Sequence, residues 1–541
     1  MKQQTARWVR TLSVMVWCLM AGTSTVMAAE ADSGDQAPVL RTAWPYDVGP
    51  LNSQGYGANQ MVAQAMVYEP LVRYHKGEIE PWLATDWALS EDGRTYTFTL
   101  RQNVTFSDGT PFDASAVKAN VDAVLGCRAR HDWLALVNQL DHVTVVDAHT
   151  VQLVLKHPYY PTLMELSLIR PLRIASPSVL GAAGSGTQCQ LSAPVGTGPW
   201  VFSGREPGRV DHFRRNAHYW GTMPAFSGVD IHVINDPNTR AMALETGQID
   251  MVQGTRGMIS VDSFQRLSHD PRFTASRSEP LATRTFVMNS KRFPTNALPV
   301  RQAIEYAVDR PAIVKALLYG AEPVAYRLFS SRVPYADIDL PTRTFDPARA
   351  RALLEKAGWT SGDDGIRVKD GQRLTLSLYF DGEDPLQKSM SQVVQANLRA
   401  IGIEVRLQGE EEGALMKRQK NGHFNMIYSD TWGAPYEPHA YLSSMRVPAH
   451  ADYQAQQGLP MKGALDRDIG RVLTTQNPEQ RQSLYRDILT TLHDQAIYLP
   501  ISFITSRSVS NDRVSNVRFG DTMEDIPFAD MTPAERAPAH D

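Results

Sequence analysis

The stretch LTLSLYFDGEDPLQKSMSQVVQANLRAIGIEVRL, residues 374–407, decides the fold class of this chain. Apolar and polar residues alternate over residues 374–380, which is the period of a β-strand. A helical segment follows over residues 389–400, and Gly402 ends it before another alternating strand over residues 403–407. This order of strand, helix and strand predicts two parallel strands joined by a right-handed crossover.

Segments on both sides of this unit show the same mixture of strands and helices. Residues 95–100, TYTFTL, alternate strictly, and Asp113 then opens a predicted helix that runs to about Leu125. Residues 143–146 and 151–155 flank a turn and predict a hairpin. The chain is therefore expected to be α/β, with at least two lobes.

More elements are predicted in the second half of the chain. The Asp-Pro pair at residues 346–347 predicts a helix start, and Gly358 its end. Helices are also expected over residues 299–308 and 311–319, and a buried strand over residues 424–428.

Length and charge narrow the class of protein. The 541 residues exceed what one hydrophobic core usually serves, so two or three domains are expected. The formal net charge of −4 argues against a basic nucleic-acid binder. Three cysteines are too few for a disulfide-stapled scaffold or a multi-cysteine metal cluster.

The N-terminus predicts export from the cytoplasm. A basic segment precedes the apolar run 12–22, which is too short to span a bilayer. Small or β-branched residues then stand at the positions that a signal peptidase reads, up to Ala28. We expect a secretory signal peptide cleaved near Ala28. A membrane anchor is the alternative, and the polar residues 32–35 directly afterwards argue against it. Cleavage leaves Cys127 and Cys189, which either form a disulfide or remain two buried thiols.

Motifs of the common enzyme classes are largely missing from the sequence. Residues 115–118 match Ser-x-x-Lys, but no Lys-Thr-Gly or Ser-Asp-Asn partner occurs, and a helix start explains them equally well. No nucleophile elbow, His-Glu-x-x-His motif or Walker loop is present. The 14 histidines are scattered, and His439 and His450 would form an incomplete metal site. The chain is expected not to be an enzyme.

Residues 432–436, WGAPY, place two large aromatic side chains on a loop directly after a predicted buried strand. Ligands of α/β proteins bind at the carboxyl ends of strands, so this loop is a candidate pocket wall. A hydrophobic corner is the other interpretation. The residues alone thus favour an exported, two-lobed binding protein.

Motifs spread along the chain resemble bacterial extracellular solute-binding proteins of the peptide/nickel family, family 5, which serve ABC importers. They are YEPLV at 68–72, WLA at 82–84, SDGTPF at 107–112, GTGPW at 196–200, RN at 215–216, YWG at 219–221, GQID at 247–250, VRQA at 300–303 and AVDR at 307–310. Within the family the chain is most similar to nickel-binding members. The segments that carry this similarity are 42–45, 48–52, 59–61, 130–134 and 431–450.

The resemblance implies a two-lobed periplasmic-binding-protein fold of class II, of the large peptide/nickel type, with a hinge. Residues 1–28 would be the signal peptide and residues 29–280 the first, discontinuous lobe. Residues 281–502 would form the second lobe, and residues 503–541 would return to the first.

The resemblance also implies a function. A periplasmic, monomeric protein would capture nickel(II) as a chelate with a small metallophore that bears carboxylates or histidine, and would deliver it to an inner-membrane permease and its ATPase. No nucleic acid would bind. The alternative is a peptide- or haem-binding protein of the same importer family.

The site residues implied by the resemblance come from both lobes. Arginines would hold carboxylates through their planar, permanently charged guanidiniums, and aromatic rings would exclude water. A neutral imidazole is a good ligand for Ni(II). The ligand-binding residues would be Tyr56, Met61, Arg130, Trp133, Arg170, Trp432 and Tyr436, and the metal ligand His450.

Overall fold

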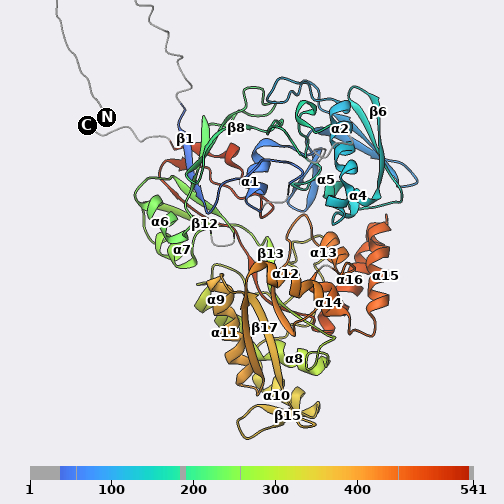
Figure 1. Ribbon diagram of the computed structural model, residues 1–541, viewed down its shortest axis with the longest axis vertical. Helices are drawn as coiled ribbons and strands as arrows, with labels where there is room; N and C mark the ends of the chain where they lie inside the picture. Colours follow the sequence, from blue (N-terminus) through green and yellow to red (C-terminus); the bar gives the residue numbers. More distant parts are fainter. Residues whose placement is uncertain (1–36, 56–57, 183–189, 256–257, 449, 535–541) are drawn as a thin grey trace, which may run out of the picture. The chain divides into compact units, whose positions relative to one another are not determined.

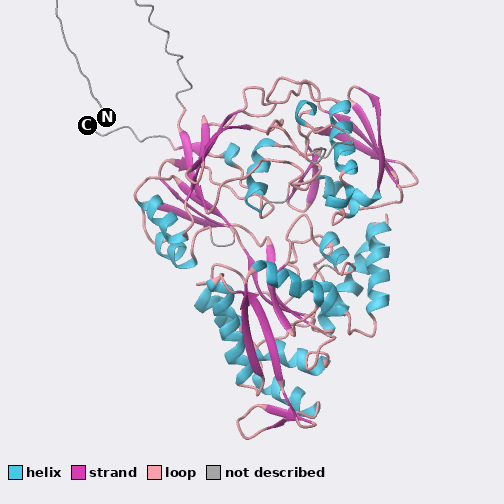
Figure 2. Ribbon diagram, viewed as in Figure 1, coloured by secondary structure: helices cyan, strands magenta, loops and turns pink. Residues whose placement is uncertain are grey.

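The computed structural model describes residues 37–55, 58–182, 190–255, 258–448 and 450–534. The predicted signal peptide, Tyr56 and Cys189 lie outside these ranges. Among the described strands, two larger sheets of seven and five strands stand out (Figure 1). Helices accompany both sheets (Figure 2), which confirms the α/β class. None of the helices in the described ranges is long and apolar enough to cross a membrane.

The seven-stranded sheet combines early and late segments of the chain. Strand β1 (Val39–Trp44) lies in the middle of the sheet and pairs in parallel with β10 and β11. Strand β21 (Arg507–Asn511) pairs antiparallel with β11 and β12. Across the sheet the order is β12 (Phe273–Arg277), β21, β11 (Met251–Gly254), β1, β10 (Gly228–Val233), β9 (Val210–Arg215) and β8 (Trp200–Glu206).

A separate antiparallel sheet has the order β4 (Ala84–Leu89), β5 (Thr95–Leu100), β7 (Thr150–Leu155) and β6 (Leu140–Asp147). It confirms the predicted strand at 95–100 and the predicted hairpin. Helix α2 (Ala114–Gly126) packs on β6 and β7. Asp113 caps it as predicted, because its carboxylate accepts a hydrogen bond from the Ala116 amide at 2.8 Å.

The five-stranded sheet contains the unit that the opening stretch predicted. Its order is β18 (Glu404–Glu410), β17 (Thr375–Asp381), β19 (Met426–Asp430), β13 (Ala282–Met288) and β20 (Tyr498–Ile504). Strands β17 and β18 pair in parallel, and α11 (Pro385–Arg399) connects them. The helix begins before the predicted residue 389, because Asp384 accepts hydrogen bonds from the Leu386 and Gln387 amides.

The other predicted helices of this half are also present, as α8 (Leu298–Ala307), α9 (Arg310–Leu317) and α10 (Pro347–Lys356). Helices α9 and α11 pack on the strands of the five-stranded sheet (Figure 2). The later helices are α12 (Glu412–Asn421), α13 (His439–Ser444), α14 (Ala451–Gln456), α15 (Lys462–Thr474) and α16 (Pro478–Asp494). The earlier ones are α1 (Ala58–Val67), α3 (Arg128–His131), α4 (Ala135–Gln139), α5 (Thr162–Leu166), α6 (Pro237–Glu245) and α7 (Val261–Leu267).

The chain passes between the two larger sheets through two short connections. Residues 278–281 link β12 to β13, and residues 505–506 link β20 back to β21. The connections lie side by side, since the Ser278 amide donates to the Ser506 carbonyl at 2.9 Å. The Ser506 amide in turn donates to the Ser278 hydroxyl at 2.9 Å.

The apolar core is divided in the same way. One cluster, which includes Phe286, Leu376 and Met390, lies against the five-stranded sheet. Another, which includes Trp44 and Phe213, lies against the seven-stranded sheet. A third cluster joins residues of the N-terminal half, such as Leu136 and Leu166, to Tyr441 and Leu473 of the C-terminal half. Residues on either side of this junction are therefore placed to share a binding site.

Cys127 caps the C-terminus of α2 and is disulfide-bonded. The sequence contains only two other cysteines, Cys18 and Cys189, and both lie outside the described residues. The free-thiol interpretation of Cys127 is therefore wrong.

Candidate functional site

The loop after β19, residues 431–437, is held at both ends. The amide of Thr431 donates to the Thr283 carbonyl at 2.8 Å, and its hydroxyl accepts from the Thr283 amide at 2.8 Å. The Glu437 carboxylate accepts from the Gly433 amide at 2.7 Å. Burial raises the pKa of Glu437 to about 7, while hydrogen bonds from the Thr431 side chain and the Gly433 and Trp432 amides oppose the rise. The aromatic side chains of the loop thus project from a fixed backbone.

Five of the predicted site residues form a continuous row of contacts. The Arg170 guanidinium carbon lies 5.6 Å from the ring centre of Trp133. The Trp133 ring centre is 6.4 Å from that of Tyr436, which is 6.3 Å from Trp432. The Trp432 ring in turn lies 5.4 Å from the imidazole of His450. The row crosses from the N-terminal to the C-terminal half between Trp133 and Tyr436.

The charges of both predicted arginines act on one histidine, His131. His131 is fully buried, and burial together with the charges of Arg130 and Arg170 lowers its pKa to about 4. This histidine therefore stays neutral beside its charged neighbours. Arg130 also borders a recess together with Leu51 and Arg205.

Tyr436 connects the arginine end of the row to its aromatic end. Only 7% of its surface is exposed. Burial raises its pKa, as does Glu524, while Arg170 and Arg173 oppose the rise. The phenol is therefore neutral near neutral pH and can donate a hydrogen bond to an anionic ligand.

His450 is the imidazole of the row. It directly precedes α14 and is half-buried. Burial lowers its pKa from 6.5, and Asp452 opposes this change. The neutral imidazole, which is the form that binds metals, is favoured by these surroundings.

Besides Arg130, one described residue of the predicted site, Met61, is not part of the row. Met61 is half-buried on α1, and the contacts described above do not include it. Tyr56 lies outside the described residues. Among the described residues, no group of three or more His, Cys, Asp or Glu side chains is arranged to hold a metal ion.

His439 and His450, the two histidines of the predicted incomplete metal site, contact different residues in the structure. His439 is 1% exposed, and its Nε2 lies 3.5 Å from an Oε1 oxygen of Glu165 on α5. Tyr159 donates to that same oxygen at 2.6 Å. His439 thus belongs to a buried contact between the two halves of the chain.

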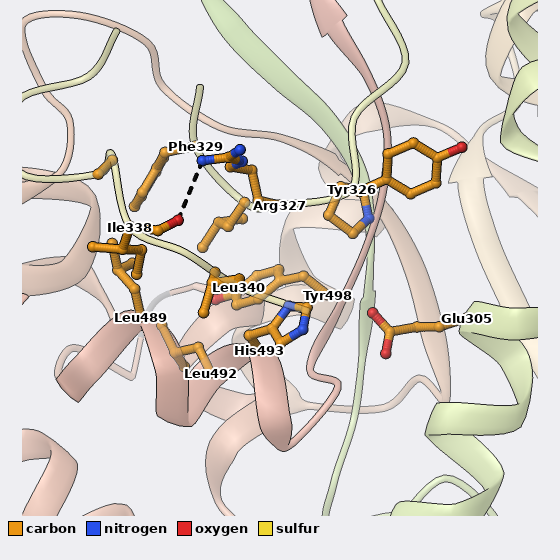
Figure 3. Close-up of a pocket in the computed structure, with 13 residues that line it drawn as sticks. Glu305, Tyr326, Arg327, Phe329, Ile338, Leu340, Leu489, Leu492, His493 and Tyr498 are labelled. Carbon is orange, nitrogen blue, oxygen red and sulfur yellow. Dashed lines mark hydrogen bonds between the residues drawn. The ribbon is translucent and has the colours of Figure 1, made fainter. Parts of the chain in front are cut away.

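An apolar cavity lies elsewhere, bordered by β20 and α16 (Figure 3). Its wall includes Leu340, Leu489 and Tyr498, and its charged or titratable groups include Glu305, Arg327 and His493. None of the predicted site residues within the described ranges lines it.

Sequence reasoning missed the polar residues that support the row. His131 lies inside the quoted motif of residues 130–134 but received no role, and Asp452 follows His450 by two positions without a motif of its own. The structure shows both as buried, at 0% and 5% exposure. For His131, the sequence offers one indication, which is its position between the predicted site residues Arg130 and Trp133. No signal in the sequence marked Asp452.

The fold, and a row of contacts that joins the two halves of the chain, are those expected of a solute-binding protein, and the comparisons agree on this class. The protein-family model described as "Bacterial extracellular solute-binding proteins, family 5 Middle" matches residues 78–453. The chain belongs to family 5 of the bacterial extracellular solute-binding proteins.

Individual relatives of known name narrow the comparison further than the family model does. The chain is 47% identical over 528 residues to the nickel-binding periplasmic protein of Escherichia coli strain K12, which covers 97% of this chain and 99% of that protein. It is 50% identical to NikA from Brucella suis, whose crystal structure is in complex with Fe(III)-EDTA, with a TM-score of 0.90 over 92% of this chain and 100% of that one. An ABC transporter substrate-binding protein from Sinorhizobium meliloti is 30% identical, with a TM-score of 0.76 over 92% and 100% of the chains. These relatives confirm the predicted family and the two-lobed α/β fold.

Proposed function

We propose that this chain is the periplasmic binding component of an ABC importer that captures nickel(II) as a chelate with a small, carboxylate-bearing organic molecule. The row from Arg170 to His450 carries the proposal, because it joins a carboxylate-binding cation to a metal-binding imidazole through aromatic walls. The similarity to the nickel-binding protein of E. coli supports nickel as the metal. The cargo then passes to a membrane permease and its ATPase.

Each end of the row has its own task. The guanidinium of Arg170, with Arg130 nearby, binds the carboxylates of the chelator. Trp133, Tyr436 and Trp432 exclude water, which strengthens these charge contacts. His450 supplies one imidazole nitrogen to nickel, so the chelator supplies most of the other donors.

We further propose that the lobes are residues 29–280 with 503–541, and residues 281–502, in a monomer secreted by cleavage near Ala28. The short connections 278–281 and 505–506 would act as the hinge. A ligand that contacts both lobes binds the closed state better than the open state, and so shifts the population toward closure.

The test of this function is to identify what the native protein carries. Protein purified from the periplasm is denatured, and the released metal and organic compound are measured by elemental analysis and mass spectrometry. We expect nickel together with a polycarboxylate or histidine-bearing compound. Release of a peptide or a haem without nickel would contradict the proposal.

Acid should release the metal through His450. A neutral imidazole binds nickel and its protonated form does not, and burial lowers the pKa of His450 from 6.5. The contribution of His450 to affinity should therefore be complete above pH 6.5 and decline as the pH falls below it. Isothermal titration with nickel and L-histidine between about pH 8 and pH 4 measures this contribution.

The control for this titration is His450→Ala, which retains only the pH dependence that arises from protonation of L-histidine. The difference between the two proteins isolates the imidazole. Parallel pH profiles for the two proteins would show that His450 does not bind the metal.

A further inference from the structure

Asp452 lies at the centre of a buried hydrogen-bonded cluster behind His450. One carboxylate oxygen, Oδ1, accepts from the hydroxyl of Tyr441 at 2.8 Å and from the hydroxyl of Tyr498 at 2.8 Å. All three side chains are at most 5% exposed. The two tyrosines come from α13 and β20, so the carboxylate joins three separate elements.

The cluster and the metal-binding end of the row form a closed ring of contacts. Tyr441 packs its ring edge to face against Trp432, with 5.6 Å between the ring centres. Trp432 contacts His450 at 5.4 Å, and His450 is separated from Asp452 by a single residue. His450, Trp432, Tyr441 and Asp452 are therefore linked in a closed ring, which the chain itself completes between residues 452 and 450.

The other end of α14 is also held in place. The carbonyl of Ala455 accepts from the Ser290 amide at 2.8 Å and from its hydroxyl at 2.5 Å. Gln454 donates to the Lys420 carbonyl at 2.7 Å. With its C-terminal end fixed by these contacts and its first turn fixed by Asp452, the short helix has little freedom to move His450.

Tyr498 links the cluster to the apolar cavity. Its ring lines that cavity beside Leu340 and His493 (Figure 3), while its hydroxyl binds Asp452. Asp452 thus holds the hydroxyl of a side chain whose ring borders the cavity. Loss of the carboxylate should therefore loosen Tyr441 and Tyr498 together.

We propose that Asp452 is a positioning residue, which fixes the His450 imidazole toward the chelated metal through Tyr441, Tyr498 and Trp432. This role rests on the proposed function, because it requires His450 to bind the metal. Groups that orient a metal ligand typically change metal affinity about 10–100-fold when they are removed. Asp452 makes no contact with the ligand in this role and acts only through His450.

The experiment compares two chelates on the full-length protein. Nickel with one equivalent of L-histidine leaves coordination positions open for His450, whereas EDTA surrounds Fe(III) with its own donors. We expect Asp452→Ala to weaken binding of the nickel probe about tenfold and to leave Fe(III)-EDTA binding unchanged. The ligand-field absorption of bound nickel should also shift, because imidazole coordination is lost from part of the population.

Matched variants separate positioning from general damage. Asp452→Asn retains an acceptor oxygen and should keep most of the affinity, while Tyr498→Phe removes one hydrogen bond without a change of shape and should weaken only the nickel probe. In a His450→Ala background, Asp452→Ala should cause no further loss. Three outcomes would overturn the inference. Asp452→Ala could weaken both probes equally, or Asp452→Asn could lose as much nickel affinity as Asp452→Ala. Asp452→Ala could also lose its full nickel affinity increment in the His450→Ala background.

The proposed function can fail separately. Wild-type protein that binds neither probe would overturn the function and the inference together. A nickel affinity that falls in His450→Ala but not in Asp452→Ala or Tyr498→Phe would overturn only the positioning role.

Discussion

Arg170→Ala is expected to weaken binding of a nickel–carboxylate chelate by about 30-fold or more. Removal of one member of a buried, charge-assisted pair costs about 2–5 kcal/mol, and each 1.4 kcal/mol is about tenfold in affinity. The Nε and Nη1 atoms of Arg170 are withdrawn from solvent, and its guanidinium lies against Trp133. A carboxylate bound there is consequently screened very little by water. Isothermal titration with nickel citrate measures the loss.

Two further variants make this result specific. Arg170→Lys keeps the positive charge but loses the planar fork, so its affinity should lie between those of the wild type and the alanine variant. Arg209, with 79% side-chain exposure, pairs with Glu206 at the surface, and Arg209→Ala should bind normally. Wild-type affinity in Arg170→Ala would exclude this arginine from the site.

Local patterns predicted much of the fold because each one depends on neighbouring residues. The alternation at residues 374–380 is the alternation of buried and half-buried positions that β17 has in the structure. Helix α11 begins earlier than the pattern predicts, because Asp384 forms its N-cap and Pro385 lies in its first turn. The arrangement of the two larger sheets depends instead on contacts between distant segments, which no local pattern contains.

The row of site contacts illustrates this limit. Trp133 and Tyr436 meet although they are far apart in sequence, and nothing in either segment specifies that meeting. Family resemblance supplied the residue types, but not the order of the contacts. It also gave Arg130 and Arg170 equivalent roles, whereas the structure puts Arg170 against the aromatic row and Arg130 on the wall of a recess.

Buried polar side chains were the hardest residues to foresee. An aspartate next to a helix start, such as Asp452, is usually explained by helix capping or by solvent exposure. Only the folded structure shows that Tyr441 and Tyr498 converge on its carboxylate. The same is true of the ion pair between Arg284 and Glu322. Arg284 directly follows Thr283, which is hydrogen-bonded to Thr431 at the start of the site loop.

This ion pair connects the sheet that carries the site to the segment after α9. Glu322 accepts from Arg284 Nη2 at 2.8 Å and from Nε at 3.1 Å, and Ser502 of β20 donates to it at 2.5 Å. Arg284 also donates to the Tyr428 hydroxyl oxygen at 2.5 Å. The side chains of Arg284 and Glu322 are 8% and 1% exposed, so water cannot replace either partner.

Glu322→Ala should therefore lower the free energy of unfolding by about 3–5 kcal/mol, since it leaves the Arg284 charge buried without its main partner. Urea denaturation followed by circular dichroism measures this change. Glu279→Ala is the matched control, because Glu279 pairs with Arg332 at 3.4 Å with 69% of its side chain exposed, and its loss should cost less than about 1 kcal/mol. Arg284 and Glu322 with Tyr428 and Ser502 join strands β13, β19 and β20, and the loop that carries Trp432 follows β19. Chelate affinity should therefore also fall in Glu322→Ala, even where the protein remains folded. A similar small loss of stability in both variants would show that the buried pair contributes no more than a surface one.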